Sequence, residues 1–186
     1  NFPAILSRLK EILERFLTVV YCVAVSFIAD STLDELPSSS QVGQARVGGI
    51  DINNPRMRAV IEAVTELAAA PKGFRASDIA PKVRQIIGVD ENVYTPRKAA
   101  YDLKKLRGKN IVRKIGKSRR YEVVPDGLRS VTALLMLREK VIKPVLAGVS
   151  NPRPGRQPKN QSPLDAHYAA FQSQMHDLFQ LIGIAV

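Results

Sequence analysis

The chain has 186 residues and a formal net charge of +11, from 28 Lys and Arg against 17 Asp and Glu. Its 45% content of hydrophobic residues is typical of a chain with a folded core and argues against wholesale disorder. The single cysteine, Cys22, excludes an internal disulfide framework and a zinc site built from several cysteines.

The first predicted element is an amphipathic helix. Apolar residues recur at helical spacing from Ile5 to Val20, with charged residues on the opposite side. Residues 16–29, FLTVVYCVAVSFIA, carry no charge, but a membrane-spanning helix needs about 20 such residues. We therefore expect residues 1–29 to form a dimerisation segment with no membrane partner. Whether residues 19–28 continue the helix or form a strand is open, because β-branched residues dominate there.

Residues 30–49 have a composition that is typical of a connection between domains. They contain Pro37, three consecutive serines, and glycines at positions 43, 48 and 49. We expect a linker or mobile loop here.

Two helices are predicted at the start of a central domain over residues 50–124. Asn54 and Pro55 suit the cap and first position of a helix that ends before Gly73, and Ser77 suits the cap of a second helix that ends at Gly88. Residues 74–76 between them are predicted to form a short strand. The expected core positions are Met57, Val60, Ile61, Val64 and Leu67 in the first helix, and Ile79, Val83, Ile86 and Ile87 in the second.

A third helix is predicted over residues 95–109. Thr95 can cap it and Pro96 suits its first position, where the missing N–H needs no partner. Ala99, Leu103 and Leu106 then form one buried stripe, and the face opposite is basic.

A hairpin with a cationic tip is predicted after this helix. Two β-rich runs, residues 110–115 and 121–124, are joined through residues 116–119. From residue 95 to residue 121 there are eleven Lys or Arg and one acid, Asp102, so this stretch holds +10 of the net charge of +11. Such a concentrated basic face is typical of a nucleic-acid binder.

The order of elements over residues 52–124, with LRGKNIVRKIGKSRRYEVV at residues 106–124, resembles the winged helix-turn-helix group that includes MarR-, ArsR- and PadR-like regulators. The resemblance implies a mainly α fold with a small β wing (α+β), flanked by N- and C-terminal helices. It also implies a recognition helix at residues 95–109 in the major groove of DNA. The wing at residues 116–120 would lie on the backbone or in the minor groove.

Twelve residues are expected to contact double-stranded DNA. Five of them face the bases or the groove, four supply weaker phosphate contacts, and three belong to the wing tip. Arg120 alternatively pairs with Glu122 or packs against the sheet. In that order the residues are Thr95, Arg97, Lys98, Tyr101 and Lys105; Lys104, Lys109, Arg113 and Lys114; and Lys117, Arg119 and Arg120.

The C-terminal third is predicted to be helical on both sides of a linker. Residues 125–147 form a long helix that is apolar on more than one face, with Pro144 expected to kink or end it. Residues 148–161 are rich in Pro and Gly, a composition that indicates a linker. Residues 162–186 are predicted to form a last helix. The apolar surface of the flanking helices indicates a homodimer through the N- and C-terminal helices.

The sequence suggests no enzyme, cofactor or metal site. His167 and His176 lie nine residues apart, which is not the spacing of helical metal ligands, and no glycine-rich phosphate loop is present. The function we expect is sequence-specific binding of double-stranded DNA by a cytoplasmic, nucleoid-associated and dimeric transcriptional regulator. Two alternatives stay open: a winged-helix protein–protein adaptor in a larger assembly, and a DNA-binding accessory protein of a mobile element or of chromosome machinery.

Overall fold

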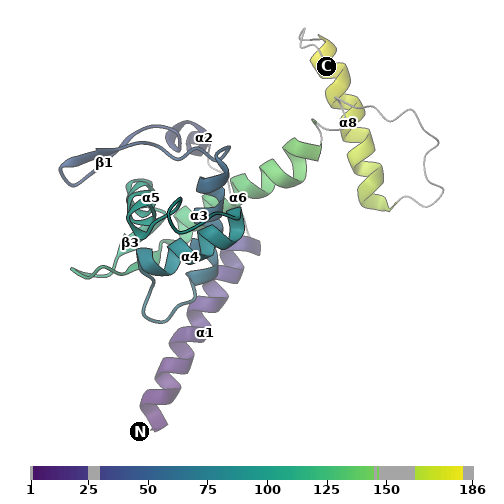
Figure 1. Ribbon diagram of the computed structural model, residues 1–186. Helices are drawn as coiled ribbons and strands as arrows, with labels where there is room; N and C mark the ends of the chain where they lie inside the picture. Colours follow the sequence, from purple (N-terminus) through teal and green to yellow (C-terminus); the bar gives the residue numbers. More distant parts are fainter. Residues whose placement is uncertain (1, 25–29, 145, 147–161, 182–186) are drawn as a thin grey trace. The chain divides into compact units, whose positions relative to one another are not determined.

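A computed structural model describes residues 2–24, 30–144, 146 and 162–181 (Figure 1). The chain divides into two compact units, Asn1–Leu135 and Met136–Val186, and each is described by itself. The structure is mainly helical with a small amount of antiparallel sheet, which agrees with the predicted α+β class; it has two hairpins, of which one was predicted.

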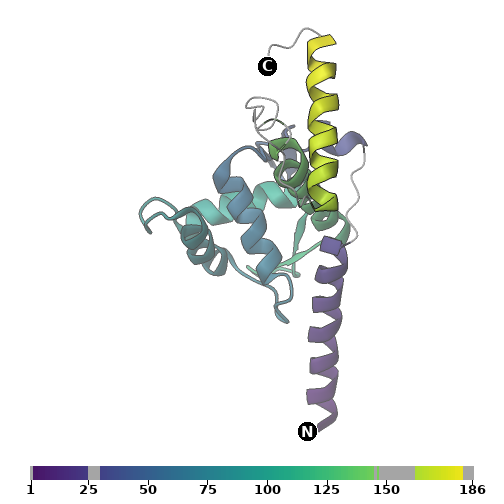
Figure 2. The ribbon, with the colours of Figure 1, turned by 90° about the vertical axis from the view of Figure 1, so that its right-hand side faces the viewer.

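The first unit has one hydrophobic core, which four helices enclose. They are α3 (Pro55–Leu67), α4 (Ala76–Ile87), α5 (Pro96–Gly108) and α6 (Pro125–Leu137), as Figures 1 and 2 show from two directions. The expected position Ile86 is wrong, because its side chain is 37% exposed. The fully buried aliphatic positions include Val60, Ile61, Val64, Ile79, Val83, Leu103, Leu106, Leu128 and Val131.

Local capping sets where the helices begin. The side chain of Asn54 accepts the Arg56 N–H at 2.9 Å, and that of Thr95 accepts the Lys98 N–H at 3.3 Å, so these two caps are confirmed. The predicted Ser77 cap is wrong. α4 begins before it, at Ala76, because the Asp78 carboxylate accepts the N–H of Arg75 at 2.8 Å.

The predicted hairpin is formed by β3 (Val112–Lys114) and β4 (Tyr121–Val123), which pair antiparallel with Arg113 opposite Glu122. The short strand expected at residues 74–76 is reduced to a single bridge between Phe74 and Tyr121. Their rings stack with centroids 6.5 Å apart, which ties the segment before α4 to the hairpin.

The predicted linker at residues 30–49 is wrong. It contains α2 (Asp30–Glu35) and a second hairpin of β1 (Ser40–Val42) and β2 (Ala45–Val47), in a sheet of its own. The physical reason is that each strand ends in a valine, Val42 or Val47, and both of these side chains are buried. Gly43, at φ +64, opens the two-residue turn between the strands. Leu36, Val42 and Val47 are buried in this segment, and Ile50 is buried just after it.

α1 (Phe2–Ala24) is helical through Ala24, which settles that part of the open choice between helix and strand; residues 25–29 lie outside the described part. The helix touches the core through Val19, and Arg15 donates to the carbonyl of Ala70 at 3.2 Å. The guanidinium of Arg129 lies 4.9 Å above the ring of Tyr21. None of the helices described is both long and apolar enough to cross a membrane.

In the second unit, the chain passes from α6 into a π-helical turn, η1 (Arg138–Ile142), and later forms α8 (Pro163–Leu181). The predicted irregularity near Pro144 thus takes the form of a wider helical turn. Proline has no N–H to offer the Lys140 carbonyl, and the Tyr168 hydroxyl donates to that oxygen at 2.5 Å. The side-chain amide of Gln172 donates to the Pro144 carbonyl at 2.8 Å. The predicted linker at 148–161 lies outside the described residues.

Candidate nucleic-acid interface

α5 presents one buried and one basic face. Ala99, Leu103 and Leu106 are fully buried, and on the opposite side Arg97 and Tyr101 are exposed. Because successive residues of a helix are rotated by about 100°, the residues opposite the buried stripe can be identified from their spacing. These positions are Arg97, Tyr101, Lys104 and Gly108, with Lys98 and Lys105 beside them.

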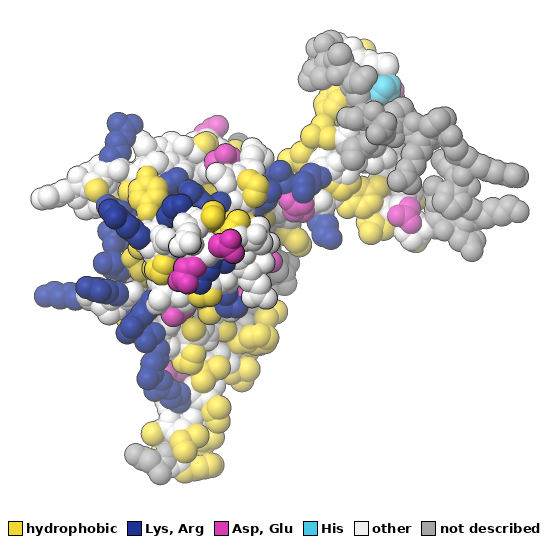
Figure 3. Space-filling view, in the orientation of Figure 1, with side chains coloured by type: hydrophobic (Ala, Val, Ile, Leu, Met, Phe, Trp, Pro, Cys, Tyr) yellow, Lys and Arg dark blue, Asp and Glu magenta, His cyan; other side chains and the backbone are white. Residues whose placement is uncertain are grey.

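Two hairpins lie on either side of α5. The β1–β2 hairpin lies on one side and the β3–β4 hairpin on the other (Figure 1). Lys and Arg side chains line the edge of the unit on which both hairpins project (Figure 3). Asp102, the one acid of residues 95–121, is 0% exposed, so its carboxylate does not reach this surface. The surface that the sequence predicted to be basic therefore carries cations from three elements with no acid from α5 itself.

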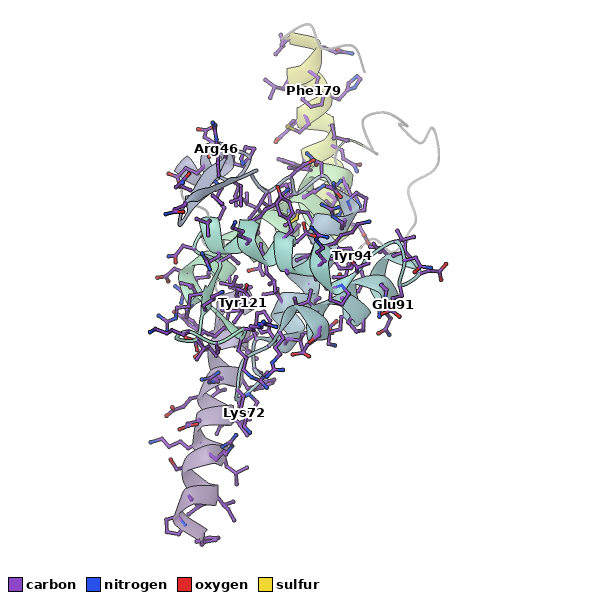
Figure 4. The ribbon with its side chains drawn as sticks, turned by 60° about the vertical axis from the view of Figure 1, so that its left-hand side comes forward. Arg46, Lys72, Glu91, Tyr94, Tyr121 and Phe179 are labelled. Carbon is purple, nitrogen blue, oxygen red and sulfur yellow. The ribbon has the colours of Figure 1, made fainter. Side chains whose placement is uncertain are left out.

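A buried polar network lies beneath this face. The Tyr94 hydroxyl donates to Oδ2 of Asp102 at 3.0 Å, and a guanidinium nitrogen of Arg56 lies 3.3 Å from Oδ1 (Figure 4 labels Tyr94). Burial raises the pKa of Asp102 and outweighs the opposing effect of Arg56. Burial, with the neighbouring Asp102, also raises the pKa of Tyr94. The network joins the start of α3, the residue before the α5 cap and α5 itself, and so fixes the orientation of α5.

Five of the predicted DNA-contacting cations are unengaged. Their side chains make no hydrogen bond or ion pair with any residue that the structure describes, so they are available to phosphates. They are Arg97 and Lys104 on α5, Lys114 at the end of β3, and Lys117 and Arg119 at the tip of the β3–β4 hairpin.

On α5 itself, three predicted contact residues have partners. Lys98 Nζ donates to the carbonyl of Val93 at 2.6 Å. Lys105 Nζ lies 5.4 Å from the centroid of the Tyr101 ring, which holds both side chains on the outward face. Lys98 would have to give up the Val93 carbonyl before it could contact a phosphate, whereas Lys105 and Tyr101 already lie on the outward face. The hydroxyl of Thr95 is committed to capping the helix.

Three further predicted residues are engaged outside α5. Lys109 Nζ donates to the Glu35 carbonyl and, at 2.9 Å, to the Ser38 hydroxyl, so it holds the segment between α2 and β1. Arg113 pairs with Glu122 at 2.8 Å across the hairpin. Arg120 donates to the Gly73 carbonyl at 3.2 Å, in the segment between α3 and α4.

Arg46 was missed by the sequence reading. It is exposed on β2, and its Nε donates to the Ser39 hydroxyl at 2.8 Å. The signal that could have found it is the alternation in the sequence ARV, which places Arg46 on the face opposite the buried Val47. The glycine and serine content of the surrounding segment outweighed that signal.

Two further findings bear on what kind of site this is. Within the part of the chain that the structure describes, no group of three or more His, Cys, Asp or Glu is arranged to hold a metal ion. Comparison with protein families, with curated proteins and with solved structures finds no match to this chain.

Proposed function

We propose that this chain is a winged helix-turn-helix protein that binds double-stranded DNA, with α5 as the recognition helix and the β3–β4 hairpin as the wing. The observation that carries the proposal is the outward face of α5 together with the hairpin tip. Four unengaged Lys and Arg side chains lie there, with a fifth, Lys114, at the end of β3, and the one acid of that stretch is buried. DNA phosphates are the ligand that such a surface suits.

The shape of α5 favours duplex DNA over duplex RNA. Its 13 residues make a rod about 20 Å long, and the major groove of B-DNA, about 12 Å wide, admits a helix. The corresponding groove of A-form RNA is too narrow for side chains to read. The first two turns of α5 carry its exposed side chains, and these are the turns that reach base edges in helix-turn-helix proteins.

The contacts divide into two kinds. Arg97 and Tyr101, at the centre of the outward face, are positioned to meet base edges. Lys104, Lys117 and Arg119 are positioned to hold phosphates. Phosphate contacts fix where the protein sits, and only base contacts specify a sequence. Sequence specificity therefore rests on very few side chains.

We further propose that the protein acts as a homodimeric transcriptional regulator, cytoplasmic and associated with the nucleoid, without a catalytic activity or cofactor. α1 supports the dimer, because it exposes large apolar side chains at alternating spacings of four and three residues. This is the seam of a coiled coil. The side chains, each between 46% and 70% exposed, are Phe2, Leu6, Leu9, Leu13, Phe16 and Val20.

The same apolar seam favours the second candidate, an adaptor whose helices bind other proteins in a larger assembly. Such a protein needs no affinity for DNA. A DNA-binding role in a mobile element or chromosome machinery uses the same interface as the leading proposal, and differs from it only in which DNA sites are occupied.

The test is binding to a labelled DNA duplex, measured by fluorescence anisotropy across a series of salt concentrations. If four to six phosphates are neutralised per protomer, a plot of log K against log salt has a slope of roughly −4 to −5. Binding that persists with a nearly flat slope contradicts a phosphate-holding face. Absence of binding even at low salt favours the adaptor.

A further inference from the structure

The β1–β2 hairpin packs on the outward face of α5, at its C-terminal end. A Cβ atom added to Gly108 would lie 2.8 Å from Ser40 Cβ and 3.1 Å from Val42 Cγ2. β1 therefore occupies the space that any side chain at position 108 would need. Gly48, just after β2, lies close to the end of the Lys105 side chain. The hairpin thus covers the last turn of the outward face and leaves the first two turns open.

The hairpin is held in this place by contacts on its inner side. Val42 and Val47 are 7% and 2% exposed. Lys109, in the residue after α5, donates to the Ser38 hydroxyl at 2.9 Å, so the entry to β1 is fastened to the end of the recognition helix. A surface on the outer side of the hairpin consequently has a fixed position relative to α5.

That outer side has the chemistry of a phosphate contact. Arg46 and Gln41 are cross-strand partners and are both exposed. Arg46 uses Nε to donate to Ser39, and its two terminal nitrogens make no bond to any described residue. Arg46 is also the one charged side chain in residues 36–50, so nothing acidic in this segment opposes an anion.

The hairpin is placed where a second strand of phosphates would lie. Arg46 and the wing residue Tyr121 lie on opposite sides of α5 (Figure 4), and both hairpins project from the same edge of the unit (Figure 1). A helix in the major groove has one sugar–phosphate backbone on each side of it. If the β3–β4 hairpin follows one backbone, the β1–β2 hairpin faces the other.

We propose that the β1–β2 hairpin is a second wing, which binds the DNA backbone across the groove from the β3–β4 hairpin through the guanidinium of Arg46. The inference rests on the proposed DNA binding of α5. It adds that the protein contacts the backbones on both sides of the groove, and that β1 covers only the C-terminal end of α5, at Gly108.

The test compares three single variants by anisotropy at several salt concentrations: Arg46→Ala in the second wing, Arg119→Ala in the first, and Arg8→Ala on α1 as a matched loss of one exposed charge. Each phosphate contact contributes about 0.9 to the salt slope, which corresponds to about tenfold in affinity near 0.1 M salt. We expect Arg46→Ala and Arg119→Ala each to weaken binding by about that factor and to flatten the slope by about one. The double variant should show the sum of the two effects, because the contacts are separate.

The outcomes distinguish the second wing from the proposed function. If Arg46→Ala matches the Arg8→Ala control while Arg119→Ala weakens binding, the second wing is wrong and the DNA-binding face stands. If Arg46→Ala binds more tightly, the hairpin hinders α5, and the second wing is again wrong. If the unaltered protein binds no DNA, both proposals fail. Circular dichroism of each variant shows that a loss of binding is not a loss of folding.

Discussion

At the scale of single residues, Asp102 has a different role in the structure from the one that the sequence suggests. In the sequence it is a lone acid that slightly reduces the charge of a basic helix. In the fold it is fully buried and bound by Tyr94 and Arg56. No periodicity in the sequence predicts this network, because its three members come from two helices and the segment between them.

Removing the Tyr94 hydroxyl tests how much the network stabilises the fold. The variant Tyr94→Phe keeps the ring but takes a donor from a buried carboxylate, and we expect it to lower the free energy of unfolding by about 1–3 kcal/mol. Urea unfolding followed by circular dichroism measures the change. The control is Tyr101→Phe, whose side chain is 49% exposed, and we expect it to stay within about 0.5 kcal/mol of the unaltered protein. Equal effects of the two variants would show that the network adds no stability.

The pH dependence of stability gives a second test at this residue. Burial raises the pKa of Asp102 above its ordinary 3.8, so the folded state holds the proton more tightly than the unfolded chain. This group therefore makes the free energy of unfolding fall as the pH rises from 3.8 through the folded pKa. Asp102→Asn removes that fall. We expect its stability relative to the unaltered protein to be greater at pH 7 than at pH 4, and a difference that is the same at both pH values would contradict the assignment.

At the scale of elements, the features that the sequence predicted correctly are those that depend only on residues near to one another in the chain. The caps at Asn54 and Thr95, the stripe of Ala99, Leu103 and Leu106, and the turn through Gly116 each depend on neighbouring residues, and each is present in the structure. The β1–β2 hairpin depends instead on packing against α5, some sixty residues further along the chain. Its strands are three residues long, too short for alternation to outweigh a composition rich in serine and glycine.

Because Gly108 lies against β1, we expect Gly108→Ala to change stability in the direction opposite to the one that helix propensity alone predicts. Alanine is preferred over glycine in a helix by about 1 kcal/mol, so propensity alone would stabilise Gly108→Ala. The added Cβ meets Ser40 Cβ at 2.8 Å, however, and we expect a net destabilisation of about 1–3 kcal/mol and a displaced hairpin. Thermal or urea unfolding measures it.

Gly48→Ala is the matched control for this contact. A Cβ there would lie 3.8 Å from Lys105 Cε, an ordinary van der Waals distance, so we expect little change in stability. If Gly108→Ala is instead more stable than the unaltered protein, β1 does not pack tightly against α5, and the position of the β1–β2 hairpin as a second wing is contradicted.

At the scale of the whole molecule, the proposed dimer depends on the apolar side chains that α1 exposes. Leu9 and Leu13 are 57% and 56% exposed, so replacing both by Asp should leave the folded protomer intact. We expect this double variant to convert a dimer to a monomer, because each charge would have to be buried in the seam. Analytical ultracentrifugation measures the mass.

The control for the seam is Leu33→Asp, which places one charge on α2 at a leucine that is 55% exposed and outside α1. It should leave the dimer unchanged. A double variant that remains dimeric, or an unaltered protein that is monomeric at the same concentration, would contradict the proposal that α1 forms the interface.

The central claim is that the outward face of α5 and the tip of the β3–β4 hairpin bind DNA, and the affinity of a triple variant tests it most directly. Arg97, Lys104 and Arg119 would be replaced by Ala in one protein. Arg8, Lys10 and Lys140, three exposed cations that belong neither to α5 nor to the β3–β4 hairpin, would be replaced by Ala in a control of equal net charge. Near 0.1 M salt, each lost phosphate contact costs about tenfold in affinity. We predict that the first protein binds a DNA duplex at least about 100-fold more weakly than the control. Equal affinities of the two proteins would contradict the claim, because binding would then follow net charge and not this face.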